Sequence, residues 1–372
     1  MIRTLFVFGT RPEAIKLCPV VLKLRQDPEV FHVQVCVTAQ HRGMLDQVLS
    51  VFGVTPEFDL DLMQPGQSLS QVTGRMMIAL EPILDAARPD FAIVQGDTTT
   101  TLCGALAAFY KQVPVAHVEA GLRTGDLQQP FPEELNRVLT GRMAALHFAA
   151  TEGAADNLRR EGVEDGRIFV TGNSGIDAVL AIKARLERNP LPSPHYLIPG
   201  KKLVLVTAHR RESFGAGFED ICEGIRRIAR EEDVQVVYPV HRNPNVTGPV
   251  ERLLSNAPRV TLIPPLDYVP FVDLMMRATL LLTDSGGVQE EGPSLGKPIL
   301  VMRERTERPE AVAAGTVRLV GTDPDKIELE ALKLLRDPRE RALMSRVHNP
   351  YGDGHASGRI AGVLRSFHRE KV

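Results

Sequence analysis

A glycine-containing turn between an apolar run and a helix-forming run is the first feature of this chain that could do chemistry. Residues 279–297 read TLLLTDSGGVQEEGPSLGK, so an apolar segment leads into Ser285, Gly286 and Gly287 and then into a helix. The unpaired backbone N–H groups at such a helix start favour an anion. Glycine lets the anion approach the backbone closely, because it has no Cβ atom. The sequence therefore predicts a phosphate-binding turn.

A second turn of this kind lies near the start of the chain, in residues 4–17 (TLFVFGTRPEAIKL). Gly9 follows an apolar run, and Pro12 suits the first turn of the helix that comes next. Arg11 and Lys16 add positive charge to this helix start. One anion-binding turn in each half of the chain suggests a diphosphate held in a cleft between the halves.

Three carboxylates in the segment 94–142 follow or interrupt apolar runs. Asp97 has two interpretations, as a functional acid or as the N-cap of a helix begun by residues 98–101. Glu119 interrupts the run VPVAHVEAGL, where a charged side chain must be paired or face a cleft, so a functional role is favoured. Glu133 lies in the first turn of a predicted helix, where the helix dipole alone favours an acid.

Two histidines follow apolar runs in the second half of the chain. His209 ends the run KLVLVTA and is followed by Arg210, and His241 ends the run VVYPV. Such charge at the end of an apolar strand fits a strand tip that faces a polar ligand, and a solvated surface is the alternative. Metal binding is the weaker hypothesis, because the chain has no H-x-x-x-H or CxxC spacing.

Acidic and basic residues surround the glycine-containing turn at 285–287. Glu291, on the helix after the glycines, either lies on the surface or accepts hydrogen bonds from sugar or ribose hydroxyls. A phosphate-binding turn followed by an acid suits a nucleotide sugar. Arg308 either adds charge to the ligand site or belongs to an exposed loop. The chain lacks G-x-G-x-x-G and GxxxxGK[ST], so a dehydrogenase or a P-loop nucleotidase is poorly supported.

The elements that must position these residues are short apolar runs that alternate with helical segments. Continuous apolar strands separated by helices indicate parallel sheets covered on both faces, which is a doubly wound α/β architecture in each half. In such sheets the ligand lies beyond the carboxyl ends of the strands. The predicted strands are 4–9, 33–39, 91–97, 113–120, 146–150, 167–172, 202–210, 234–242, 260–265, 279–285, 298–302 and 316–321.

The length of 372 residues predicts two domains, joined through the segment 171–200, which ends in a proline-rich stretch. With 44 Lys plus Arg against 46 Asp plus Glu, broad binding to nucleic acid or to a membrane surface is not expected. No apolar stretch approaches the roughly 20 residues that cross a bilayer, so we expect a soluble cytoplasmic protein. The four cysteines lie far apart and are expected to be buried free thiols.

Eight motifs in fixed order point to a family. They are FGTRPEAIK, QGDTTTT, HVEAGLRTGD, PFPEELNR, TAHRRESFG, YPVH, TDSGGVQEE and RTERPEAV. The chain closely resembles the non-hydrolysing bacterial UDP-N-acetylglucosamine 2-epimerases over nearly its whole length. The resemblance implies two Rossmann-like domains of the glycosyltransferase-B type, residues 1–170 with about 359–372 and residues 171–358, with the ligand in the cleft between them. It also implies a homodimer that interconverts UDP-GlcNAc and UDP-ManNAc for surface polysaccharides, without metal or nicotinamide.

The family chemistry is elimination of UDP to 2-acetamidoglucal and return of UDP with a proton on the opposite face of C2. By their positions in the motifs, the residues that match those the family uses around the sugar are Asp97, Glu119, Glu133 and His209. Our hypothesis is that Asp97 and Glu133 share the acid and base work on the two faces, while Glu119 and His209 stabilise and orient the sugar and the leaving group. The positions that match family contacts to the nucleotide are Arg11, Lys16, Phe271, Ser285, Gly286, Gly287, Glu291 and Arg308. Leu266 stands where relatives often present Gln, so one contact to uracil or ribose is missing or comes from the backbone.

Many bacterial members bind UDP-GlcNAc at a second, activating site. Gln40, Arg210 and His241 fit that pattern, whereas Gly43 and Gly66 replace larger polar residues. Three other functions compete with this interpretation. They are an epimerase of a modified UDP-amino sugar, a retaining glycosyltransferase of the same fold, and a catalytically silent sensor of nucleotide sugars.

Overall fold

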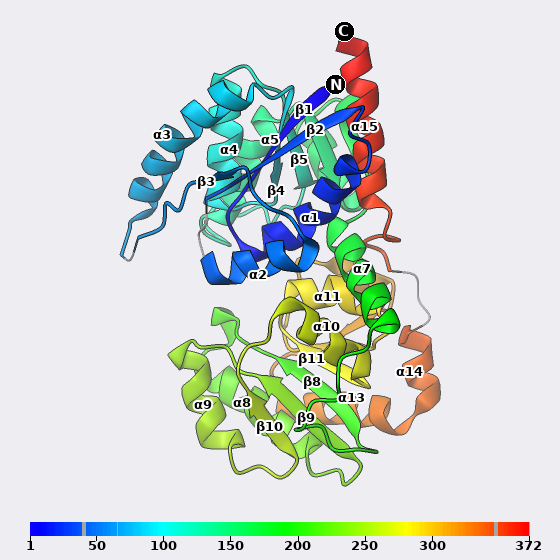
Figure 1. The fold of residues 1–372 in the computed structure, drawn as a ribbon. Helices are drawn as coiled ribbons and strands as arrows, with labels where there is room; N and C mark the ends of the chain where they lie inside the picture. Colours follow the sequence, from blue (N-terminus) through cyan, green and yellow to red (C-terminus); the bar gives the residue numbers. More distant parts are fainter. Residues whose placement is uncertain (39–41, 65, 346–348, 372) are drawn as a thin grey trace. The chain divides into compact units, whose positions relative to one another are not determined.

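The structure is a computed structural model that describes residues 1–38, 42–64, 66–345 and 349–371. The chain folds into two compact units, Met1–Ala178 with Tyr351–Val372 and Val179–Pro350 (Figure 1). The domain boundaries expected from the sequence, at residue 170 and near residue 359, stay predictions. No helix in the described ranges combines the length and the apolar character that crossing a bilayer requires.

The first unit is built on a parallel sheet of seven strands within its described residues, in the order β3-β2-β1-β4-β5-β6-β7. Its strands are β1 (Ile2–Phe8), β2 (Phe31–Val37), β3 (Phe58–Asp59), β4 (Phe91–Gln95), β5 (Val115–Ala120), β6 (Leu146–Ala149) and β7 (Ile168–Val170). Its helices are α1 (Arg11–Arg25), α2 (Arg42–Phe52), α3 (Leu69–Ala87), α4 (Thr99–Tyr110), α5 (Glu133–Met143), α6 (Glu152–Arg160) and α15 (Ala356–Lys371), with a 3-10 turn η1 (Asp165–Arg167). The C-terminal helix α15 packs beside α1 (Figure 1).

The second unit repeats the plan with six parallel strands in its described part, in the order β10-β9-β8-β11-β12-β13. Its strands are β8 (Lys202–Thr207), β9 (Val234–Pro239), β10 (Val260–Ile263), β11 (Leu280–Thr283), β12 (Ile299–Val301) and β13 (Val317–Leu319). Its helices are α8 (Ala216–Ile228), α9 (Pro244–Leu254), α10 (Tyr268–Arg277), α11 (Gly286–Ser294), α12 (Pro309–Ala313), α13 (Pro324–Arg336) and α14 (Pro338–Ser345), with a 3-10 turn η2 (Arg211–Ser213). Helix α7 (Ser174–Arg188) runs from the first unit into the second.

The predicted strands and the doubly wound architecture are confirmed. Each predicted apolar run contains one strand, because central strands covered on both faces need apolar side chains on both, as in the fully buried β4 and β11. The two-residue strand β3 was not predicted. In each parallel sheet the order in which successive strands are added reverses between two adjacent strands, β1 and β4 in the first and β8 and β11 in the second. Loops that follow such a pair leave a crevice for ligands.

The cysteine prediction is also confirmed. All four thiols, Cys18, Cys36, Cys103 and Cys222, are buried and free. Burial raises the pKa of Cys103 to about 11 and the pKa of each other thiol to about 12, because the thiolate would lose its hydration. These thiols are packing residues.

Two histidines form part of the core of the first unit. His117 on β5 and His147 on β6 are direct neighbours in the strand register, and each is 1% exposed. His117 Nε2–H donates to the carbonyl oxygen of Gly96 at 2.7 Å. Burial lowers the pKa of His117 to about 3 and that of His147 to about 4, because a charged imidazole would be poorly solvated there.

These two imidazoles predict a loss of stability in mild acid. Their folded-state pKa values lie below the unfolded value of about 6.5, so the unfolded chain binds more protons and stability falls as the pH drops from about 6.5 towards 4. Each group contributes about 1.4 kcal/mol per pH unit in this range. We expect His117→Gln to reduce the pH dependence of the free energy of unfolding by this amount, measured by urea denaturation between pH 4.5 and 7. The exposed His32→Gln is the control, and equal slopes for His117→Gln and the unsubstituted chain would contradict the prediction.

Candidate functional site

The loops at the switch point of the first sheet are joined by one buried carboxylate, Glu13, which is 1% exposed. Its Oε2 accepts hydrogen bonds from Gly9 N at 3.0 Å and from Thr10 N and Oγ1 at 2.8 and 2.7 Å. Its Oε1 accepts from Thr98 Oγ1 at 2.7 Å and Thr101 Oγ1 at 3.2 Å. Burial raises the pKa of Glu13 and these hydrogen bonds oppose the shift. The sequence analysis missed Glu13, although the T-x-x-E capping box at its helix start was a usable signal.

Helix α1 places two predicted site residues beyond this anchor. Arg11 is its half-buried first residue, and Lys16 lies between its first and second turns. The Lys16 ammonium forms an ion pair with the carboxylate of Glu119, and the two side chains are 15% and 8% exposed. The structure thus brings together a predicted nucleotide contact and a predicted catalytic acid.

Glu119 occupies a strained position at the end of β5. Its φ is +61°, a left-handed conformation that is costly for a residue with a Cβ atom, and the strand register shifts between Val118 and Ala120. Its Oε1 also accepts from Asn173 Nδ2 at 3.3 Å, and its Oε2 accepts from Gln95 Nε2. A charged group in this conformation, held by three donors, is expected where orientation matters for function.

Asp97 does not cap helix α4, so the capping interpretation is wrong. The N-cap is Thr98, whose hydroxyl accepts from Thr101 N at 3.1 Å. The Asp97 carboxylate instead accepts a hydrogen bond from Arg137 Nη2 at 2.6 Å, and its backbone carbonyl accepts from Asn136 Nδ2 at 2.9 Å. Helix α5 therefore positions Asp97.

The two acids at the start of α5 differ in their surroundings. Glu134 is 1% exposed, accepts from Thr124 N and Gly125 N at 3.0 and 3.1 Å, and lies 3.2 Å from Arg137 Nη1. Glu133 is half-buried, and its carboxylate has no hydrogen bond or ion pair with any residue that the structure describes. Glu134 is thus a structural anchor, while Glu133 remains available for a ligand.

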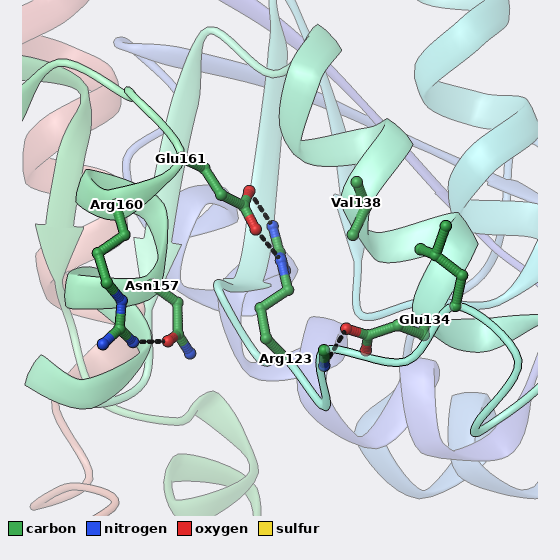
Figure 2. Close-up of a pocket in the computed structure, with 8 residues that line it drawn as sticks. Arg123, Glu134, Val138, Asn157, Arg160 and Glu161 are labelled. Atoms are coloured by element: carbon green, nitrogen blue, oxygen red, sulfur yellow. Dashed lines mark hydrogen bonds and ion pairs between the residues drawn. The ribbon is translucent and has the colours of Figure 1, made fainter.

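A pocket of about 320 Å³ in the first unit lies next to this helix (Figure 2). Two hydrogen bonds of 2.6 and 2.9 Å join Arg123 to Glu161, and Arg160 donates to Asn157. Arg123 belongs to the loop between β5 and α5 and binds Glu161, while Glu134 accepts a hydrogen bond from Gly125 N of the same loop (Figure 2). The pocket contains none of the predicted site residues, and its charged groups support the loop that leads to Glu133.

A carboxylate also joins the loops at the switch point of the second sheet. Asp284, fully buried after β11, accepts hydrogen bonds from His209 N at 2.6 Å and Arg210 N at 2.7 Å in the loop after β8. His209 Nδ1 lies 3.5 Å from its other oxygen. Burial lowers the pKa of His209, and the charge of Asp284 partly opposes this. The His209 ring stacks on His241 with centroids 5.3 Å apart. The sequence analysis missed Asp284.

The predicted phosphate-binding turn has the expected local structure. Ser285 is the N-cap residue of α11, and Gly286 and Gly287 are the first two helical residues. A Cβ atom at Gly286 would lie 2.4 Å from Arg308 Cζ, so the guanidinium rests against the turn. Arg308 Nε donates to Glu290 Oε1 at 2.6 Å, which orients the guanidinium.

The other residues predicted for the ligand sites differ in their burial and in their contacts. Phe271 on α10 and Glu291 on α11 are both half-buried. His241 Nδ1 accepts a hydrogen bond from Asn243 N at 3.1 Å. Gln40 lies outside the described residues. Among the residues that are described, no group of three or more His, Cys, Asp or Glu side chains could hold a metal ion.

The comparisons with known proteins agree with these features. The family model described as UDP-N-acetylglucosamine 2-epimerase matches residues 22–365. The chain belongs to this family. Named members from Salmonella typhimurium and Escherichia coli K12 are 56% and 57% identical, over 98% of this chain and 99% and 98% of theirs. The family resemblance drawn from the motifs is confirmed.

Solved structures show the same architecture. The UDP-GlcNAc 2-epimerase from Neisseria meningitidis, bound to UDP-GlcNAc, has a TM-score of 0.92 and 45% identity and covers 98% of this chain and 100% of its own. A glycosyltransferase of kitacinnamycin, at 14% identity and a TM-score of 0.64, covers 98% of each chain and shows likeness of fold alone. The expected class, two Rossmann-like domains of the glycosyltransferase-B type, is confirmed.

The position of Glu13 predicts a large effect of its substitution. Glu13→Gln would put an amide NH2 against donors that need an acceptor, so we expect a loss of about 3 kcal/mol in the free energy of unfolding. Urea denaturation checks this, with the exposed Glu29→Gln as control, for which we expect a change within about 0.5 kcal/mol. A loss for Glu13→Gln no larger than that of the control would show that Glu13 does not hold the loops together.

Proposed function

We propose that this protein catalyses the reversible C2 epimerisation of UDP-GlcNAc to UDP-ManNAc. The observation that carries the proposal is the 56% identity with the Salmonella UDP-N-acetylglucosamine 2-epimerase over nearly the full length of both chains. The UDP-GlcNAc in the Neisseria structure supports the same substrate. The local structure of each unit fits this chemistry, with a phosphate-binding turn in one and an acidic cluster in the other.

UDP binding is assigned to the turn at α11 and its surroundings. The first N–H groups of α11 favour the diphosphate, because they carry the positive end of the helix dipole. Arg308, held by Glu290, adds a fixed positive charge beside Gly286. The other proposed nucleotide contacts are Arg11, Lys16, Phe271, Ser285, Gly287 and Glu291.

The proton at C2 needs a base and an acid on opposite faces of the sugar. In the proposed reaction a carboxylate takes the C2 proton, the C1–O bond breaks, and its electron pair leaves with UDP to give 2-acetamidoglucal. The reverse step adds a proton to the other face of C2 while UDP returns to C1. We assign this work to Asp97 and Glu133. Helix α5 presents Glu133 at its first position and holds Asp97 through Arg137 one turn later.

Glu119 and His209 are assigned to stabilising and orienting the sugar and the leaving group. The Lys16–Glu119 pair offers both signs of charge, which suits a step that separates an electron-poor C1 from an anionic UDP. His209 is oriented by Asp284 and by its stack on His241. Substrate activation through Gln40, Arg210 and His241 is part of the proposal, and strictly linear initial rates with UDP-ManNAc alone would argue against it.

A homodimer, a cytoplasmic location and a role in supplying ManNAc-type precursors for surface polysaccharides stay predictions from the family resemblance. So does the independence of the reaction from metal and nicotinamide cofactors. The competing functions differ in what they do to UDP-GlcNAc alone. A glycosyltransferase without acceptor or a silent sensor leaves the hydrogen at C2 in place, and an epimerase of a modified sugar acts on that sugar faster.

Proton NMR of UDP-GlcNAc with the enzyme in heavy water tests the proposal. We expect UDP-ManNAc to appear with deuterium at C2, because the proton that returns comes from solvent. Asp97→Asn and Glu133→Gln should each lower turnover by about 10²- to 10⁴-fold, the range of general acid–base catalysis. Unchanged C2 signals with the unsubstituted enzyme would refute the function, and full exchange by a variant would remove that residue from the catalytic set.

The turn at α11 predicts a specific effect on UDP affinity. Gly286→Ala would place a methyl group 2.4 to 2.6 Å from the Arg308 guanidinium and push it from the turn. We expect UDP to bind about 10-fold or more weakly by calorimetry, since one charge-assisted contact contributes about 1.5–3 kcal/mol. Gly248→Ala on α9, with no atom within 4 Å, is the control and should retain the affinity. Equal affinities for both variants would contradict the assignment.

A further inference from the structure

Asn173 lies between β7 and α7, and its hydrogen bonds join the start of α7 to two parts of the first unit that are distant in the sequence. It is 3% exposed. Its backbone N–H donates to the carbonyl oxygen of Tyr351 at 2.7 Å, and its Oδ1 accepts from Gly175 N at 2.8 Å. Its Nδ2 donates to Glu119 Oε1 at 3.3 Å. The residue therefore contacts one of the proposed catalytic-site acids directly.

The orientation of the Asn173 amide follows from these partners. Gly175 N–H is a donor and needs an oxygen opposite it, so Oδ1 must face the start of α7. The NH2 group then faces the Glu119 carboxylate, which accepts its hydrogen bond. The hydrogen bond at the start of α7 thus fixes the Asn173 side chain with its NH2 group toward the Glu119 carboxylate.

The position of Asn173 in the chain distinguishes it from the other donors to Glu119. Lys16 and Gln95 belong to α1 and β4, whose residues all lie in the first unit. Asn173 directly precedes α7, the helix that leaves this unit after Ala178. It is also bonded to Tyr351, where the chain returns to the unit. Both chain connections are therefore within one hydrogen bond of Asn173.

The two connections are tied to each other at further points. A Cβ atom at Gly172 would lie 3.3 Å from the Tyr351 carbonyl oxygen, so the two backbones pass in close contact. Asp177 on α7 accepts from Ala356 N and Ser357 N, at 3.2 and 2.8 Å, at the start of α15. A change in the course of α7 would therefore move Asn173 together with the returning chain.

We propose that Asn173, held in place where the chain leaves and re-enters the first unit, is a positioning residue for the carboxylate of Glu119. This inference rests on the proposed epimerase function, in which Glu119 orients the sugar and leaving group. The backbone strain at Glu119 leaves its side chain dependent on its donors for a single orientation. Asn173 supplies a donor that its own bonds to Tyr351 and Gly175 hold in place.

Asn173→Asp tests this with little change in shape. An Asp at this position keeps an oxygen for Gly175 N–H and remains a good N-cap, but it sets a second carboxylate against Glu119 in place of a donor. We expect kcat for UDP-GlcNAc to fall roughly 10- to 100-fold with KM changed less than about 3-fold. The acidic limb of the kcat–pH profile should move to higher pH, since a neighbouring like charge favours the protonated carboxyl.

Asp177→Ala is the matched control. It removes two hydrogen bonds from the same connections and leaves the Asn173 amide that donates to Glu119 in place, so we expect a lower melting temperature with kcat within about 2-fold. Asn173→Ser serves if the Asp variant fails to fold, because serine can cap α7 but is too short to reach Glu119. It should show the same fall in kcat.

The outcomes separate this inference from the function itself. If the unsubstituted enzyme gives no UDP-ManNAc, the proposed function fails. If that enzyme is active and a folded Asn173 variant keeps the kcat of the unsubstituted enzyme, the inference is overturned. It is also overturned if the acidic limb of the kcat–pH profile of Asn173→Asp stays at the pH of the unsubstituted enzyme. An equal loss of kcat in Asp177→Ala would also overturn it, because the effect would then belong to the connections in general and not to Glu119.

Discussion

Each unit depends on one buried carboxylate that ties together the loops at the switch point of its sheet. Glu13 accepts from the loops after β1 and β4, and Asp284, which follows β11, accepts from backbone N–H groups in the loop after β8. Parallel sheets bring the ends of adjacent strands together, but the loops beyond them carry polar groups that need partners. A carboxylate accepts several hydrogen bonds at once. These bonds offset the free-energy cost of removing its charge from water only when all of them are made.

Three of the proposed functional residues lie next to these two anchors or to their hydrogen-bond partners in the chain. Lys16 lies on the helix whose capping box contains Glu13, Asp97 directly precedes Thr98, and His209 donates its own backbone N–H to Asp284. The conformation of these loops is therefore stabilised by acids that do no chemistry in the proposed reaction. The acids that face the sugar in this proposal can then depart from ordinary geometry, as Glu119 does with its positive φ.

The sequence predicted the strands and the turns well, and the buried charges poorly. Apolar runs identify central strands because both faces are covered, whereas β3 has only two residues and no such signal. Glu13 was missed although its capping box is visible in the sequence, because the donors Thr98 and Thr101 reach it only in the folded chain. Asp284 was missed because all its donors come from a strand end distant in the sequence. The capping interpretation of Asp97 was wrong because the hydroxyl of Thr98 makes that bond and Arg137, distant in sequence, takes the carboxylate.

The contrast between Glu133 and Glu134 shows what tertiary structure adds to a motif. Both acids stand in the first turn of α5, where the helix dipole favours either. The carboxylate of Glu134 accepts hydrogen bonds from Thr124 N and Gly125 N and pairs with Arg137, so these partners already occupy it. Glu133 has no such commitments among the described residues. In the proposed reaction one acid takes a proton and the other gives one, and a side chain that is not occupied by other partners suits such work, so the proposal uses Glu133 and not Glu134.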